Sequence, residues 1–122
     1  MSKTVLLVED YADTRELMKF MLEEVMGHHV IEAVNGLEAV EQARQERPDI
    51  ILMDISMPVM DGIEATRLIK MLDGFDDVPI VAITAHSDEY QEEALNAGVN
   101  QVVCKPVDLE ELQPVLSHYL SL

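Results

Sequence analysis

Four short apolar runs in this 122-residue chain are each followed by polar residues that could do chemistry. Glu9 and Asp10 follow the run at 5–8, Asp54 follows 50–53, Thr84 follows 80–83, and Lys105 follows 102–104. If the runs are parallel strands, their carboxyl ends share one edge of a sheet, which is where ligands bind in such sheets. A polar residue after any one run could simply mark where the chain leaves the core, but the set of four predicts a site.

The residue types at this edge suggest phosphoryl transfer. Carboxylates about 5 Å apart repel by about 3 kcal/mol per pair at an effective dielectric near 20, and a proton or a bound cation relieves this. Hard oxygen ligands favour Mg²⁺, which leaves coordination positions for phosphate oxygens. An aspartate can also be phosphorylated as a nucleophile. Asp54 is the best candidate, because it ends the central run between the acidic pair and Thr84. Lys105 and the metal would supply positive charge, and the Thr84 hydroxyl could donate to a phosphoryl oxygen.

The loop that follows Asp54 supports such a site. It contains Pro58, which fixes one backbone angle, and Gly62, which permits unusual ones. A rigid loop of this kind could direct a backbone carbonyl, for instance that of Ser56, at a metal. Asp61 is predicted to cap the helix that begins near Gly62.

The elements that must position these residues alternate along the chain. The four apolar runs and a weaker one at 30–31 are continuous rather than alternating, as in strands buried on both faces of a parallel sheet. Between them, apolar residues recur with helical spacing. The stripes comprise Leu17, Met18, Met21, Leu22, Val25 and Met26; Leu37, Val40 and Ala43; Ile63, Ile69 and Leu72; and Leu109, Leu112, Val115, Leu116, Tyr119 and Leu120. A further helix, at about 88–96, is acidic and should be exposed. Five strand–helix units predict a parallel sheet covered by helices on both faces.

Composition limits the function. The 24 acidic and 8 basic side chains give a formal charge of −16, which argues against direct nucleic-acid binding. With 48% hydrophobic residues the chain should fold, as one domain. Membrane insertion and a signal peptide are not expected, and a single cysteine, Cys104, fits a cytoplasmic location. Cys104 is expected to be buried and His28-His29 to form a solvated turn. Lys105 is the only base among ten acids after residue 70.

These motifs together resemble the receiver domain of two-component response regulators, the CheY-like family. The resemblance extends from Val5 to the last helix. It rests on Glu9-Asp10, on Asp54 with Met57-Pro58 and Met60-Asp61-Gly62, on Thr84-Ala85, and on Lys105-Pro106. It implies an α/β, flavodoxin-like (βα)₅ three-layer sandwich whose five-stranded parallel sheet has the order 2-1-3-4-5.

The resemblance also implies roles. Asp54 would be the phosphoacceptor, with Thr84 following the phosphoryl group and Lys105 pairing first with Asp54 and then with that group. Asp10, Asp54, the Ser56 carbonyl and, mostly through water, Glu9 would bind Mg²⁺. The donor would be a phosphohistidine on a sensor histidine kinase or a histidine phosphotransfer protein. Residues 1–122 would form a single receiver domain without an output domain. The domain would assist only its own phosphorylation and dephosphorylation, and would signal to a downstream protein.

Two departures from the family pattern affect the output. Val102 stands where the family usually has Tyr or Phe, and a β-branched aliphatic cannot swing a ring, so output through loop movement is expected. The acidic fourth helix and residues 108–111 lack the basic partners used for dimers through the fourth and fifth helices, so a monomer is expected.

Two other functions stay open from the residues alone. An α/β phosphohydrolase would use the same aspartyl-phosphate chemistry. It would want a second acid two residues after the nucleophile, where this chain has Ser56. A receiver-like binding module that is not phosphorylated is the other alternative, and the intact set of acids, Thr84 and Lys105 argues against it.

Overall fold

Five parallel strands form one sheet in the order β2-β1-β3-β4-β5 in the computed structural model, which describes residues 2–55, 60–85 and 87–121. The strands are β1 (Thr4–Val8), β2 (His29–Ala33), β3 (Ile50–Asp54), β4 (Ile80–Thr84) and β5 (Gln101–Cys104). Every predicted strand is present, with bounds that differ by at most two residues. The flavodoxin-like topology expected from the resemblance is therefore confirmed.

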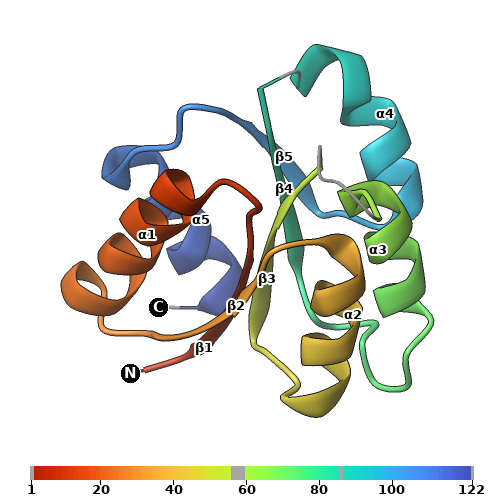
Figure 1. The fold of residues 1–122 in the computed structure, drawn as a ribbon, viewed down its shortest axis with the longest axis horizontal. Helices are drawn as coiled ribbons and strands as arrows, with labels where there is room; N and C mark the ends of the chain where they lie inside the picture. Colours follow the sequence, from red (N-terminus) through yellow and green to blue (C-terminus); the bar gives the residue numbers. More distant parts are fainter. Residues whose placement is uncertain (1, 56–59, 86, 122) are drawn as a thin grey trace.

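Helices cover both faces of this sheet (Figure 1). They are α1 (Ala12–Phe20), which continues into a π-helix, η1 (Met21–Val25), then α2 (Gly36–Gln45), α3 (Gly62–Lys70), α4 (Ser87–Ala97) and α5 (Leu109–Leu120). In Figure 1, α1 and α5 lie on one side of the sheet, and α2, α3 and α4 lie on the other. Among the described residues, no helix is long and apolar enough to cross a membrane.

The core has two halves, one on each face of the sheet. Leu6 and Val8 pack into the half beneath α2, α3 and α4, whereas Val5 and Leu7 pack into the half beneath α1 and α5. Successive strand residues point to opposite faces, so a strand covered on both sides must be apolar throughout. This is why the central strands read as continuous apolar runs.

Two predicted helix stripes are only partly buried. Leu17 and Val25 are exposed, whereas Met18 and Leu22 lie in the core. Leu17 lies beside the strip of α1 that faces the sheet and lines the surface near Lys105 instead. The Met26 N–H bonds to the Met21 carbonyl, and this wider turn rotates Val25 outward. Leu37 is exposed as well, because the small residues Gly36, Ala39 and Ala43 form the buried face of α2.

Two other expectations were wrong. Cys104 is exposed, because it ends the edge strand β5. Of the His28-His29 pair, His29 is exposed as expected but begins β2, whereas His28 is buried and its Nδ1 accepts a hydrogen bond from the Lys3 N–H at 3.1 Å. Burial lowers the pKa of His28, so a neutral imidazole is favoured there.

Candidate functional site

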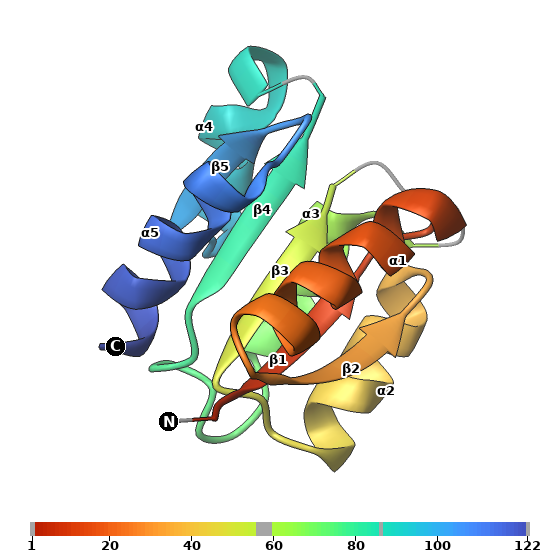
Figure 2. The same cartoon turned by 90° about the vertical axis from the view of Figure 1, so that its left-hand side faces the viewer.

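The predicted site residues meet at the carboxyl edge of the sheet, the upper end in Figure 2. Asp54 is the last residue of β3 and Thr84 the last of β4, while Glu9 and Lys105 directly follow β1 and β5. Glu9, Asp54 and Thr84 are each no more than 3% exposed. Strand register brings them together: Val8 pairs with Met53, Asp54 with Ile83, and Thr84 with Cys104.

Lys105 bridges two of the carboxylates. Its Nζ lies 3.0 Å from Glu9 Oε1 and 3.3 Å from Asp54 Oδ2. The Lys105 backbone N–H donates to the Thr84 carbonyl at 2.8 Å, which extends the β4–β5 pairing by one step and directs the side chain over Asp54. The following Lys105–Pro106 peptide bond is cis. The only base of the last 52 residues is thus the one that neutralises part of the acidic site.

The surroundings of Asp54 disfavour its ionised form. Burial, followed by hydrogen bonding and charge repulsion with Glu9, raises the pKa of Asp54 from 3.8 to about 7, and Lys105 only partly offsets this. Burial would lower the pKa of Lys105, but its contacts with Glu9 and Asp54 outweigh burial and raise it. Near neutral pH the site therefore favours either a proton on Asp54 or an added cation, the two outcomes predicted from the sequence.

Glu9 is held through both its backbone and its carboxylate. Its backbone N–H donates to the Ala33 carbonyl at 3.0 Å, and its Oε2 accepts from the Tyr11 N–H at 3.2 Å. Its other carboxylate oxygen pairs with Lys105. Asp10, on the same loop, is exposed.

The acids form an oxygen cluster suited to a hard cation. One carboxylate oxygen from each of Glu9, Asp10 and Asp54 lies within 4.8 Å of the other two. Two of these side chains are buried, so their charges are poorly screened, and Lys105 balances only one of the three. An all-oxygen donor set with an exposed carboxylate at its rim fits Mg²⁺, which binds through few carboxylates and retains water. The predicted fourth ligand, the Ser56 carbonyl, lies outside the described residues, as do Met57 and Pro58.

Two glycines let the chain close tightly around β3. A Cβ on Gly62 would lie far inside contact distance of the Asp54 and Ile55 backbone, and a Cβ on Gly36 would overlap the Met60 carbonyl. The Gly62 N–H donates to the Ile55 carbonyl at 2.8 Å, which holds the start of α3 against the phosphoacceptor candidate. Asp61 caps α3 by accepting the Glu64 N–H at 2.9 Å, as predicted.

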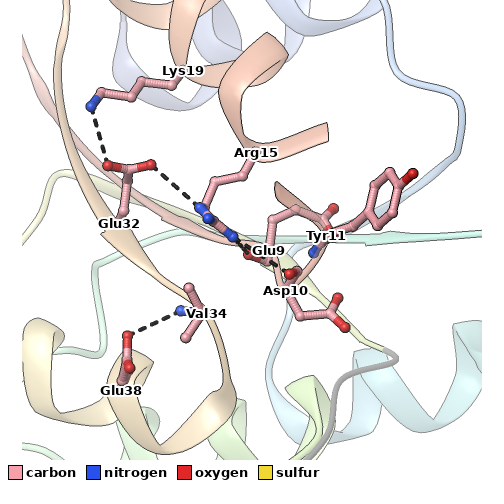
Figure 3. Close-up of polar contacts among 8 residues, drawn as sticks. All are labelled: Glu9, Asp10, Tyr11, Arg15, Lys19, Glu32, Val34 and Glu38. Carbon is pink, nitrogen blue, oxygen red and sulfur yellow. Dashed lines mark hydrogen bonds and ion pairs between the residues drawn. The ribbon is translucent and has the colours of Figure 1, made fainter. Parts of the chain in front are cut away.

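Sequence reasoning missed Arg15, which lies on α1 behind the acidic pair (Figure 3). Its Nη1 donates to the Glu9 carbonyl at 3.0 Å, and its Nε lies 3.4 Å from Glu32 Oε1 on β2. The position of Arg15 within two helical turns of the Glu9-Asp10 pair was the one feature of the sequence that could have predicted this contact. Glu32 directly follows the weaker apolar run at 30–31, but nothing in the sequence indicates a residue of the preceding helix as its partner.

An apolar hollow lies beside Lys105. It has a volume of about 390 Å³ and is lined from α1 by Thr14, Leu17 and Met18, and from the strand ends and the loop before α5 by Ala85, Lys105, Pro106 and Val107. Leu17, exposed against expectation, thus forms part of a surface next to the acidic site.

The chain is similar to known proteins over its whole length. The family model described as response regulator receiver domain matches residues 5–117. The polar-differentiation response regulator DivK of Brucella anthropi is 35% identical over 122 residues, covering 99% of this chain and 98% of that protein. The signal transduction histidine-protein kinase BarA of Escherichia coli K12 is 39% identical over 120 residues, or 98% of this chain but only 13% of that protein.

A solved structure matches equally well. The receiver domain of the sensor histidine kinase PA1611 from Pseudomonas aeruginosa PAO1 superposes with a TM-score of 0.92 at 35% identity, over 100% of both chains. In that crystal structure a magnesium ion is coordinated in the active site cleft. The same fold thus occurs both in a protein of this length and as one part of much longer kinases.

Proposed function

The chain belongs to the response regulator receiver family of two-component systems, and from this premise we propose that Asp54 is its phosphoacceptor. The observation that carries the proposal is the position of Asp54: a buried carboxylate 3.3 Å from the Lys105 ammonium, within a cluster of three acids. Glu9 accepts the Tyr11 N–H in addition to pairing with Lys105, and Asp10 is exposed, so we take Asp54, at the end of the central strand, as the nucleophile.

In the proposed reaction, an Asp54 carboxylate oxygen attacks the phosphorus of a phosphohistidine. An O–P bond forms, the N–P bond breaks, and the departing imidazole takes a proton from solvent. Asp54 must be ionised to attack, and its pKa of about 7 opposes this. A Mg²⁺ ion held by Asp10, Asp54 and the Ser56 carbonyl, with Glu9 acting through water, would favour the ionised form and neutralise phosphoryl charge.

Lys105 and Thr84 would then respond to the new group. The Lys105 ammonium bridges Glu9 and Asp54, so it can pair with a phosphoryl oxygen after a small movement. Thr84 is buried at the end of the neighbouring strand, and its hydroxyl would donate to the same group. With Val102 half-buried on β5 in place of an aromatic, this response would reach partners through movement of the loops.

The partners would be proteins. The hollow beside Lys105 is lined in part by the exposed Leu17 of α1, and Lys105 contacts Asp54. A helix carrying a phosphohistidine from a histidine kinase or phosphotransfer protein would dock there. We propose residues 1–122 as a single receiver unit that acts as a monomer. It would catalyse only its own phosphorylation and dephosphorylation, and would pass its output to a downstream protein that presents a basic or apolar surface.

Intact-mass spectrometry after incubation with acetyl phosphate and Mg²⁺ tests the proposal. Wild type should gain one phosphoryl group, and Asp54→Asn should gain none. Asp76→Asn, which changes an exposed acid, is the matched control and should behave like wild type. A wild type that never carries the group would refute the proposal, and steady donor hydrolysis without an adduct would favour the phosphohydrolase.

A further inference from the structure

Arg15 ties the loop of the acidic pair to a neighbouring strand. Its Nη1 donates to the Glu9 carbonyl at 3.0 Å and, more weakly, to the Asp10 carbonyl at 3.5 Å. The same guanidinium is anchored through Nε to Glu32, 3.4 Å away on β2. Figure 3 shows the side chain extending from α1 between the two partners. The Arg15 side chain is only 18% exposed, so most of the guanidinium stem is covered by the protein.

Lys19, one turn further along α1, provides an internal comparison. Its Nζ lies 3.1 Å from the second carboxylate oxygen of Glu32. Both bases therefore share one acid on β2, but of the two only Arg15 has recorded hydrogen bonds to the loop carbonyls. Comparing variants of Arg15 and Lys19 therefore distinguishes the effect of a positive charge near the site from the effect of a hydrogen bond to the loop.

The Asp10 position depends on this contact more than the Glu9 position does. Glu9 is fixed by Ala33, Tyr11 and Lys105 in addition to Arg15. Within the described part of the chain, the exposed Asp10 takes part in one hydrogen bond, which its carbonyl accepts from the Arg15 guanidinium. Without the guanidinium, the loop between β1 and α1 would keep Glu9 in place but lose the support that orients Asp10.

We propose that Arg15 is a positioning residue for the divalent cation: by holding the Glu9 and Asp10 carbonyls, it orients the Asp10 carboxylate toward Asp54. The inference rests on the proposed function, because it assumes that the cation binds at this cluster. Outer contacts of this kind change metal affinity by about 10-fold or more when they are removed.

The charge of Arg15 alone would have the opposite effect. A guanidinium near the site repels a dication, so its removal should strengthen Mg²⁺ binding if charge were its main contribution. A positioning role predicts weaker binding instead. Lysine cannot replace the arginine fully, since an ammonium is a point charge whereas the planar guanidinium can bridge the loop and Glu32 at once.

Calorimetric titration of the full chain with Mg²⁺ alone, at pH 8 and without a phosphodonor, tests the inference. Arg15→Gln should weaken binding about tenfold. Arg15→Lys should weaken it less, although its charge is kept, and it serves as the second variant should Arg15→Gln fold poorly. Lys19→Gln, the matched control, should bind as tightly as wild type or slightly more tightly. Circular dichroism melts establish that each variant is folded at the titration temperature.

Unchanged or tighter binding by folded Arg15→Gln would overturn the inference, as would equal weakening in Lys19→Gln. Failure of the proposed function gives a different result: wild type itself would bind no Mg²⁺ or gain no phosphoryl group. The Mg²⁺ concentration further distinguishes a positioning defect, since saturating Mg²⁺ should restore phosphorylation of Arg15→Gln to the wild-type yield.

Discussion

Replacing Asp54 by Asn should stabilise the metal-free protein, and the gain should grow with pH. The pKa of Asp54 is raised from 3.8 to about 7 by burial and by Glu9. Between these values the folded chain holds a proton that the unfolded chain releases, so wild-type stability falls as pH rises through this window. Asparagine does not titrate, so the unfolding free energy of the Asp54→Asn variant does not fall with pH for this reason.

The magnitude follows from the width of the window. From pH 5 to pH 7 the unfolded Asp54 is ionised while the folded one remains mostly protonated, which spans about two pH units. At about 1.4 kcal/mol per unit, the stability advantage of the Asn variant should increase by about 2.5 kcal/mol between pH 5 and pH 8. For a domain of this size, that corresponds to roughly 10 °C in Tm.

Urea unfolding in EDTA, followed by circular dichroism at pH 5 and pH 8, measures this difference. Taking the variant minus the wild type at each pH cancels groups that titrate in both proteins. For the control Asp76→Asn, which changes an exposed acid, the difference in unfolding free energy from wild type should stay constant with pH. The reasoning is refuted if the Asp54→Asn advantage does not grow with pH, or if this variant is the less stable protein at pH 8.

Three further predictions concern the same edge of the sheet. Mg²⁺ should bind more weakly at pH 5.5 than at pH 8 by calorimetry, because a proton on the Asp54 carboxyl competes with it; equal affinity would contradict the assigned site. Lys105→Met leaves two buried carboxylates without their cation, so in EDTA at pH 8 it should lower the unfolding free energy by about 2 kcal/mol, a smaller loss than for breaking a fully buried ion pair. An unchanged urea midpoint would argue against the pairing of Lys105 with the two acids. Gly62→Ala forces a methyl group onto the Asp54 backbone, so it should lower the unfolding free energy by more than about 2 kcal/mol and reduce the phosphorylation yield. In the control, Gly27→Ala, the added methyl group meets no atom within 4 Å. The positive φ at that position should cost about 1 kcal/mol, and the phosphorylation yield should be unchanged.

The strand ends could be read from the sequence because two physical constraints coincide there. A strand covered on both faces must be apolar, so a first polar residue such as Asp54 or Thr84 marks its end. Parallel pairing then places those ends on one edge. The close contacts of Lys105 with Glu9 and Asp54 follow from this arrangement, and so does the unfavourable charge that raises the pKa of Asp54.

Features set by side-chain geometry or helix register were not predictable in the same way. The contact between Arg15 and Glu32 joins a helix to a strand across 17 sequence positions, and a pattern of apolar residues carries no information about it. The π-helix turned Val25 outward although its spacing fitted the stripe. Cys104 is exposed at the end of the edge strand β5, and the apolar run at 102–104 does not by itself show which of its side chains are covered.

The most direct test of the account is to locate the phosphoryl group on the chain. Borohydride reduces an aspartyl phosphate to homoserine, releasing phosphate, so peptide mass spectrometry after donor treatment marks the modified position. The account predicts homoserine at position 54 in wild type, dependent on Mg²⁺, and no reduced aspartate anywhere in Asp54→Asn. Reduction at position 10 in place of 54, or a phosphoryl group on a histidine, would contradict it.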